Sequence, residues 1–191
     1  MKYPVNKARE RIFLVLCFMV FVCGLAGAVK IGPPLFRSVQ RSLSLRQARS
    51  EWHDLLNGGV PSDDSPLYNL TIPAVGLDIP VLASSEKSNL ARLPCISAVC
   101  NDRANAPVIV AHRDLHFRAL QGVEVGDRVY LTRRNGERQN YRVLRVHVML
   151  PHEAEDLAAG VQGGSLTLIT CFPFRYIGPA PERFVLVCER C

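Results

Sequence analysis

The sequence predicts a small all-β domain that follows an N-terminal hydrophobic helix. The chain has 191 residues, which is the length of one ordinary domain with accessory segments. Its 13 prolines and 13 glycines are spread along the chain and favour many turns and short strands over a helical bundle. Hydrophobic residues make up 48% of the chain and charged residues 21%, which excludes a disordered or collagen-like protein.

The N-terminal segment has the composition of a membrane-spanning helix. Residues 12–29 contain no charged side chain, and at ~1.5 Å per residue they form about 27 Å of helix, enough to cross a hydrocarbon core. Four Lys and Arg residues lie within residues 1–11, so the positive-inside rule predicts a cytoplasmic tail there and an exported remainder. We expect an uncleaved single-pass signal-anchor in the cell membrane. Small residues at 26–28 leave a cleaved signal peptide as the alternative.

The charge is unevenly distributed and favours a membrane as the partner. The formal net charge is +6, and residues 1–66 hold nine Lys and Arg against five Asp and Glu. Because this basic excess lies beside the apolar segment, it is typical of contact with anionic lipid headgroups. We therefore expect membrane lipid, and no nucleic acid, among the partners.

Residues 30–66 are predicted to form a helical stalk and a linker. Apolar residues recur at helical spacing over residues 35–57, which predicts one apolar stripe. The stripe consists of Phe36, Val39, Leu43, Trp52, Leu55 and Leu56. The sequence NGG at 57–59 ends the helix, and PSDDSP at 61–66 has the composition of a linker.

From residue 67 to residue 191 the pattern changes to short strands and turns. Strands are expected at residues 70–72, 77–82, 107–111, 128–132, 141–149, 166–170 and 184–187. Asn135-Gly136 supplies a hairpin turn between two of them. Seven or eight short strands with little helix predict a small closed or sandwiched β domain.

Two predicted strand ends carry residues that can do chemistry. Cys171 ends the apolar strand 166–170, and His112 follows the apolar run 108–111. A thiol becomes a nucleophile only beside a partner that favours the thiolate, and an imidazole is such a partner. The two strand ends form a Cys-His pair if they meet at one rim of a barrel. Spacing alone leaves unrelated structural cysteine and histidine residues as the commoner explanation.

The sequence around both residues resembles the sortases, which are exported cysteine transpeptidases. Residues 167–171, TLITC, match the TLxTC motif of that family. Residues 72–81 resemble its first strand pair, residues 111–114 (AHRD) its histidine strand, and residues 171–185 especially its class D branch. The resemblance covers residues 67–188 in family order. It implies a sortase-type eight-stranded β-barrel with short helices as the catalytic domain, behind the membrane helix and stalk.

The resemblance also implies roles for four residues. Cys171 would be the nucleophile, which holds the acyl group as a thioester, and His112 the general acid and base. Arg183 would be the oxyanion partner, because a guanidinium stays charged and donates two hydrogen bonds at once. Thr170 would orient the substrate or Arg183; an ordinary β-branched strand residue is the alternative.

The implied activity is that of a membrane-anchored sortase, an enzyme of the hydrolase class. Sortase substrates are proteins with an LPxTG-like C-terminal sorting signal, which is cut between Thr and Gly. The upstream protein is then joined to an amine acceptor, such as a cell-wall peptide or a pilin lysine. Two alternatives stay open: an exported cysteine protease that releases its substrates by hydrolysis, and a catalytically silent barrel that acts as a binding module.

No cofactor is expected. Some sortases bind calcium near the segment 152–164, and Glu153, Glu155 and Asp156 leave calcium open here. Three clustered acids are nevertheless more typical of a solvated loop, since further ligands are missing.

The remaining cysteines lie where the chain departs from the family or ends. Cys95 and Cys100 lie in a segment where a glycine-rich approach to the histidine strand is expected. Cys188 and Cys191 are three positions apart at the end of the given sequence. Each pair leaves a disulfide open in an oxidising compartment. A four-cysteine zinc site needs both pairs to converge, and we do not expect one.

Overall fold

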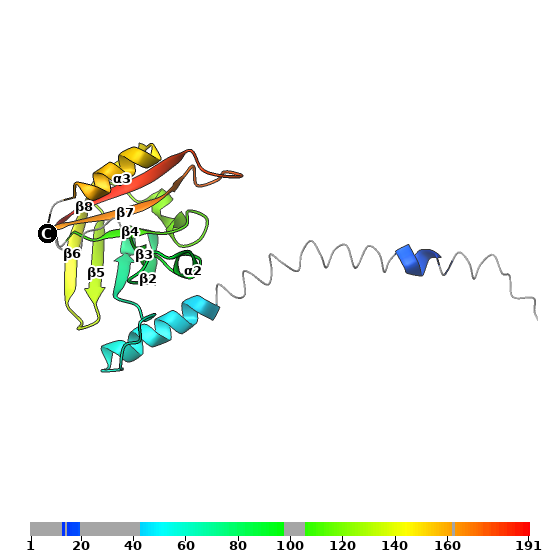
Figure 1. Cartoon of the computed structure of the whole chain (residues 1–191), viewed down its shortest axis with the longest axis horizontal. Helices are drawn as coiled ribbons and strands as arrows, with labels where there is room; N and C mark the ends of the chain where they lie inside the picture. The colour runs from blue at the N-terminus through cyan, green and yellow to red at the C-terminus, as the bar shows by residue number, and fades with distance from the viewer. Residues whose placement is uncertain (1–12, 14, 20–42, 98–105, 162) are drawn as a thin grey trace, which may run out of the picture. The chain divides into compact units, whose positions relative to one another are not determined.

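The computed structural model describes residues 13, 15–19, 43–97, 106–161 and 163–191, which are drawn in colour in Figure 1. The chain divides into two compact units, residues 1–43 and residues 44–191. In the first unit, residues 13 and 15–19 are helical. Among the described residues, no helix is long and apolar enough to span a membrane. Most of the expected anchor and all of the expected cytoplasmic tail lie outside these residues and stay predictions.

Eight strands of the second unit form one antiparallel-rich sheet that curls into a nearly closed barrel, as predicted (Figure 1). Their order across the sheet is β2-β1-β5-β6-β8-β7-β4-β3. The strands are β1 (Tyr68–Ile72), β2 (Leu77–Val81), β3 (Cys95–Ile96), β4 (Val108–Val110), β5 (Arg128–Arg133), β6 (Arg138–Met149), β7 (Ser165–Phe172) and β8 (Glu182–Arg190). A bridge between Leu82 and Cys95 joins the two edges of the sheet.

Short helices connect the strands. They are η1 (Pro73–Val75), α2 (Lys87–Leu90), η3 (Phe117–Gly122) and α3 (Pro151–Ala159). The η3 helix places Phe117 and Leu120 in the barrel core, where both side chains are fully buried. Burying a side chain of this size contributes about 1.5–3 kcal/mol relative to leaving it exposed, so η3 closes the barrel at this point.

The β5–β6 hairpin follows the predicted alternation. Gly136 has a φ of +81°, the left-handed region that an Asn-Gly turn requires, and the Arg133 amide donates to the Glu137 carbonyl. On β6 the side chains of Gln139, Tyr141 and Val143 are buried, and those between them are exposed. One face of the hairpin therefore supplies the core and the other meets solvent.

Residues 43–56 form a helix that packs on the barrel from residue 44 onward, within the second unit. Ala48, Trp52 and Leu55 are buried at spacings of four and three residues, which makes a narrower stripe than predicted. Leu43 and Leu56, which were expected in the stripe, are 57% and 41% exposed.

Polar contacts also tie this helix and the segment after it to the barrel. The Arg49 guanidinium donates to the Asp78 carbonyl of β2 at 2.7 Å, and Glu51 accepts a hydrogen bond from the Ser65 hydroxyl. The predicted stalk and linker after residue 43 are thus part of the compact domain.

The α3 helix differs from the solvated loop that the sequence predicts. Pro151 occupies its first turn, and the Glu153 carboxylate accepts a hydrogen bond from the Leu150 amide at 2.7 Å. Ala154 and Ala158 are buried against the sheet, beside β8 (Figure 1). The acidic residues thus stabilise and solubilise a helix that covers part of the barrel.

Candidate active site

Cys171 and Arg183 lie on the adjacent strands β7 and β8, and His112 lies two residues beyond the end of β4, which is paired with β7 on its other side. Cys171 of β7 lies directly opposite Arg183 of β8 in the antiparallel register. On the other side of β7, the parallel strand β4 pairs Val110 with Ile169. The Ala111 amide still donates to the Ile169 carbonyl at 3.3 Å, so the same register places His112 beside Cys171. Side chains at matching positions of paired strands point to the same face of a sheet, which the three residues therefore share.

A pocket of about 170 Å³ opens on this face. Val110 and Ile169, two residues before His112 and Cys171, form its floor, and α3 forms a wall. The lining residues are Ser97, Val110, Pro151, Ala154, Glu155, Ala158, Ile169 and Arg183. The row of Cys171, His112 and Arg183 thus lies at the end of a mostly apolar groove with one carboxylate and one guanidinium. The sequence did not predict that α3 forms a wall of this groove.

Arg183 is held by its own chain. Its Nη1 donates to the Glu182 carbonyl at 3.0 Å and to the Ala180 carbonyl at 3.4 Å. Arg183 and Cys171 are both half-buried, while His112 is exposed. A guanidinium has five N–H donors, so one nitrogen can hold the loop while the others remain for a ligand.

Three phenylalanines support the start of the β7–β8 loop, residues 173–181. Phe172 and Phe184 stack with ring centroids 6.2 Å apart, and Phe174 meets Phe184 edge to face at 5.0 Å. Aromatic pairs in these geometries contribute about 0.5–1.5 kcal/mol beyond burial. The cluster therefore fixes the backbone on both sides of Cys171 and Arg183.

Thr170 lies on the opposite face from the row. Its side chain is 2% exposed, and its hydroxyl donates to the Ala111 carbonyl at 2.7 Å. This hydrogen bond joins β7 to the residue before His112. The two-residue alternation of a strand turns Thr170 away from the face that Cys171 occupies. The expected role of Thr170 in orienting the substrate or Arg183 stays a prediction.

The other histidines are placed differently. His116 has its Nε2 2.9 Å from the Arg92 carbonyl, which engages that nitrogen in a structural contact. His53 and His152 are exposed on helices, and His147 pairs with Val185 across β6 and β8. Of the histidines, His112 is the one that the strand register brings to Cys171.

Two further cysteines are unsuited to nucleophilic chemistry. Burial raises the pKa of the Cys95 thiol to about 12, although Arg92 partly offsets it. Burial likewise raises the pKa of the Cys188 thiol to about 12, and the neighbouring Cys191 adds to this. Both stay protonated at neutral pH, and only the thiolate is a nucleophile.

Of the two disulfides that the sequence left open, Cys188–Cys191 lies within the described residues and is not formed. Cys188 and Cys191 are free thiols, and the extended β8 backbone separates their Cα atoms by ~10 Å, beyond the ~7 Å that a disulfide tolerates. Cys95 is also free, and Cys100 lies outside the described residues. Within the described part of the chain, no three His, Cys, Asp or Glu side chains are grouped to hold a metal ion.

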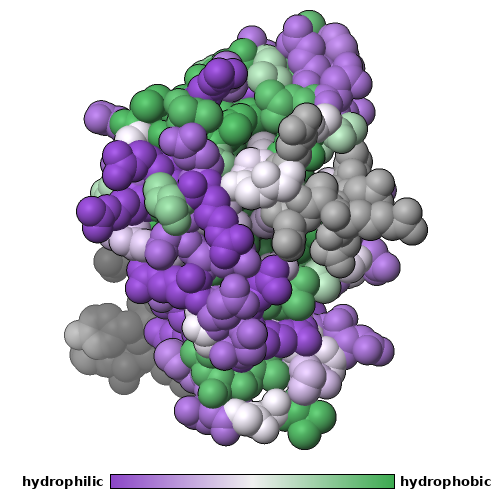
Figure 2. Space-filling model, turned by 90° about the vertical axis from the view of Figure 1, so that its left-hand side faces the viewer, coloured by the Kyte–Doolittle hydropathy of each residue, from purple (hydrophilic) through white to green (hydrophobic). Residues whose placement is uncertain are grey.

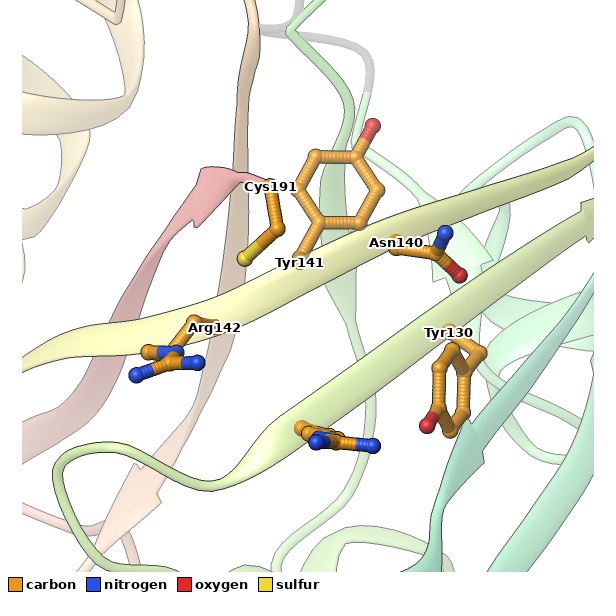
Figure 3. A pocket seen from close by; sticks show the side chains of 6 residues that line it. Tyr130, Asn140, Tyr141, Arg142 and Cys191 are labelled. Carbon is orange, nitrogen blue, oxygen red and sulfur yellow. The ribbon is translucent and has the colours of Figure 1, made fainter.

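A second pocket, of about 280 Å³, lies on the outer face of β5 and β6 (Figure 3). It is lined by Arg128, Tyr130, Asn140, Tyr141, Arg142 and Cys191. This side of the molecule presents a band of hydrophilic side chains (Figure 2). The strand register connects Arg142 through Glu189 to Ser165, which is six residues, or ~20 Å, along β7 from Cys171. The pocket is therefore separate from the row.

Arg113 is a functional candidate that the sequence analysis missed. It directly follows His112, and its Nη2 donates to the Tyr176 and Gly178 carbonyls at 3.0 and 3.1 Å. The sequence shows a charged residue next to the histidine. It does not show the hydrogen-bond partners of that residue, because they lie more than 60 positions away.

The chain is similar to known sortases in sequence. The sequence matches the sortase domain family over residues 70–191. It is 25% identical over 123 residues to sortase D of Bacillus subtilis, an alignment that covers 63% of this chain and 62% of that protein. The chain thus spans somewhat less than two thirds of this relative.

Solved sortase structures have the same fold. Sortase C1 of Streptococcus agalactiae superposes with a TM-score of 0.58 and 26% identity, covering 80% of this chain and 90% of that one. A sortase D5 of Clostridium perfringens gives a TM-score of 0.61 at 13% identity, covering 79% and 98%, which shows a shared fold. With the family match over more than half of the residues and the expected barrel around Cys171, the chain belongs to the sortase family.

Proposed function

We propose that this protein is a membrane-anchored, class D-like sortase. It cleaves an LPxTG-like sorting signal between Thr and Gly and transfers the upstream protein to an amine acceptor of the cell envelope or of a pilin. The observation that carries the proposal is the row of His112, just beyond β4, Cys171 on β7 and Arg183 on β8, beside the groove under α3.

The acyl transfer divides into two steps. The Cys171 thiol gives its proton to His112, and its sulfur attacks the Thr carbonyl carbon. The bond to the Gly nitrogen breaks, and His112 passes the proton to the departing amine. The acyl group then remains on Cys171 as a thioester. The acceptor amine gives a proton to His112 and attacks the thioester carbon. The bond from that carbon to the Cys171 sulfur breaks, and His112 returns the proton to the sulfur, which restores the free thiol. If water attacks instead, the product is the hydrolysed protein.

Arg183 is suited to the negative charge that develops on the carbonyl oxygen. It lies directly opposite Cys171, and its guanidinium keeps unused N–H donors when Nη1 is bonded to the loop carbonyls. A fixed donor of this kind stabilises the tetrahedral intermediate more than the planar substrate.

The groove matches an extended peptide with an aliphatic side chain. Val110, Ile169, Ala154 and Ala158 give it an apolar lining, and Glu155 and Arg183 are its charged groups. A Leu-Pro pair upstream of the cleaved bond buries apolar surface there, which contributes about 25 cal/mol per Å².

Trapping the acyl-enzyme is the direct test. The full chain is incubated with an LPxTG-like peptide library, and its mass is measured by intact-protein and peptide mass spectrometry. We expect an acyl adduct on Cys171, no adduct with Cys171→Ala, and a normal adduct with the control Cys191→Ser. A stable adduct on another cysteine, or none on any peptide, contradicts the proposal.

Product analysis separates transfer from hydrolysis. With an oligoglycine or a lysine-bearing peptide as acceptor, we expect the acyl group to appear on the added amine. A product that is only the free acid, whatever amine is added, makes the protein a cysteine protease.

The membrane anchor rests on residues 12–29, an uncharged stretch of 18 residues preceded by basic residues. We propose that it holds the enzyme in the cell membrane, with the amino terminus cytoplasmic, the barrel extracytoplasmic and lipid headgroups in contact with the basic residues. Recovery of the intact chain from carbonate-washed membranes supports this arrangement. A mature protein that begins at Val29 contradicts it.

A further inference from the structure

The residue after the proposed catalytic histidine bonds to the loop between β7 and β8. Arg113 donates from Nη2 to the Tyr176 carbonyl at 3.0 Å and to the Gly178 carbonyl at 3.1 Å. Its guanidinium carbon also lies 5.8 Å from the centroid of the Tyr176 ring. One side chain thus joins the segment that carries His112 to the loop that follows Cys171.

The far end of the same loop bonds to Arg183. After Gly178 the chain passes Ala180, whose carbonyl accepts a hydrogen bond from Arg183 Nη1. The guanidinium is thus tied to the loop by this bond, in addition to its 3.0 Å bond to the Glu182 carbonyl. A series of contacts runs from His112 through Arg113 and the loop to Arg183, and it links both residues that flank Cys171 in the row.

The middle of the loop is otherwise open to solvent. Residues 175–179 are all exposed, and the Ile177 side chain is entirely so. Gly178 has a φ of +99°, a left-handed turn that aims its carbonyl in a direction other residues rarely adopt. The phenylalanine cluster holds the loop at its start, so the Arg113 contacts hold the part that lies beyond the cluster.

We propose that Arg113 is a positioning residue. It holds the β7–β8 loop in place through its hydrogen bonds, an arrangement called the clamp below, and thereby keeps the Arg183 guanidinium in the row with Cys171 and His112. This inference rests on the proposed function. The chemistry favours arginine here, because a planar guanidinium can donate to two carbonyls at once and stack on an aromatic ring, whereas lysine offers one compact ammonium. Arg113 itself need not touch the substrate.

Limited proteolysis tests the clamp without any substrate. Arg175 is exposed inside the loop, so trypsin cleavage between Arg175 and Tyr176 reports how often the loop opens. We expect Arg113→Met to speed this cleavage about tenfold, since two charge-assisted hydrogen bonds are lost. Arg113→Lys should lie between Arg113→Met and the wild type.

Arg118→Met is the matched control, because Arg118 is exposed on the neighbouring η3 helix. We expect cleavage after Arg175 at the wild-type rate in this variant. Cleavage that is equally slow in Arg113→Met and in the wild type contradicts the clamp.

Single-turnover acylation tests the consequence for chemistry. We expect Arg113→Met to lower the rate of acyl-enzyme formation about tenfold or more with an unchanged KM, because the guanidinium acts on the transition state. The final fraction of acylated protein should stay at the wild-type level, which a misfolded population would lower. Arg113→Lys should restore part of the rate.

The results separate the two proposals. A wild-type protein that forms no acyl-enzyme contradicts the proposed function, and the proteolysis result still decides whether Arg113 holds the loop. Faster proteolysis together with a wild-type acylation rate shows that the clamp does not position Arg183 and overturns the inference.

Discussion

At the scale of single residues, three cysteines of the barrel show how the position of a cysteine along a strand determines the exposure of its thiol. Cys171 lies at the end of β7, half-buried and next to the groove, while Cys95 and Cys188 are fully buried. The TLITC motif could be read from the sequence and points to the first of them. The burial of the other two depends on closure of the barrel, which no local pattern shows.

The raised pKa of Cys188 predicts a loss of stability at high pH. The thiol titrates near 9 when unfolded and near 12 when folded, so the folded state keeps a proton that the unfolded state releases. Its stabilising effect is complete below pH 9 and is lost as the pH rises from 9 to 12. In that window the free energy of unfolding should fall by about 1.4 kcal/mol per pH unit for this thiol.

Urea unfolding measured between pH 8 and pH 11 checks this expectation. Cys188→Ala should flatten the dependence of the unfolding free energy on pH, whereas Cys17→Ser, which alters an exposed thiol that does not act on Cys188, should leave its slope unchanged. Equal slopes in the wild type and in Cys188→Ala would show that this thiol ionises alike in both states.

Arg183 is expected to act on the transition state. Arg183→Gln removes the charge but keeps a side chain that donates hydrogen bonds, and should lower the acylation rate about 10²–10³-fold. Stopped-flow or quenched mass spectrometry measures that rate, with Arg175→Gln, in the same loop but exposed, as the control. If the Arg183→Gln variant is acylated as fast as the control, Arg183 does not stabilise the oxyanion.

At the scale of elements, β7 shows what alternation determines and what it leaves open. The strand was predictable from its apolar run, and so was the position of Cys171 at its end. The partners of its threonines were not, because they depend on which strands lie beside β7. Thr170 bonds to the Ala111 carbonyl, whereas the buried hydroxyl of Thr167 has no hydrogen-bond partner among the described residues.

The same substitution at these two threonines should have opposite effects. Thr170→Val leaves the buried Ala111 carbonyl without its partner and should destabilise the fold by about 1–3 kcal/mol. Thr167→Val replaces an unsatisfied buried hydroxyl with a methyl group and should stabilise the fold by about 1 kcal/mol. Chemical denaturation of both variants measures the difference. A destabilised Thr167→Val variant would reveal a partner for its hydroxyl.

The α3 helix marks a limit of prediction from the sequence. Four of its residues 152–156 are polar, and the segment lacks a wide apolar stripe, which favours a loop. Two small alanines are enough to pack it on the sheet, because Val110 of β4 and Ile169 of β7 present apolar side chains there. Tertiary packing decides the conformation in such a case, and local propensity does not.

At the scale of the whole molecule, the compact domain extends beyond the barrel. Residues 44–191 form one unit, and the helix within residues 43–56 contributes Ala48, Trp52 and Leu55 to buried surface. The sequence indicated an amphipathic helix here. It could not show that the apolar stripe packs on the barrel, because a stripe does not identify the surface that covers it.

Trp52→Ala should therefore destabilise the catalytic domain. The side chain is only 5% exposed, and removing a buried aromatic residue of this size costs about 3–5 kcal/mol. Thermal unfolding of the full chain measures the loss, and Leu56→Ala, at an exposed position of the same helix, is the control. Similar melting temperatures for both variants would mean that the helix is not part of the cooperative unit.

The parallel pairing of β4 with β7 controls when the catalytic centre can exist. Neighbouring antiparallel strands can zip up from a turn, but a parallel pair forms only after the chain between its strands has crossed the sheet. His112 and Cys171 are 59 positions apart, so bringing them together requires closure of a long loop, a slow event in folding. During its synthesis the chain therefore carries the Cys171 thiol while His112, its proposed catalytic partner, is still far from it. The pair of His112 and Cys171 therefore forms late in folding, and it forms only when the barrel has closed.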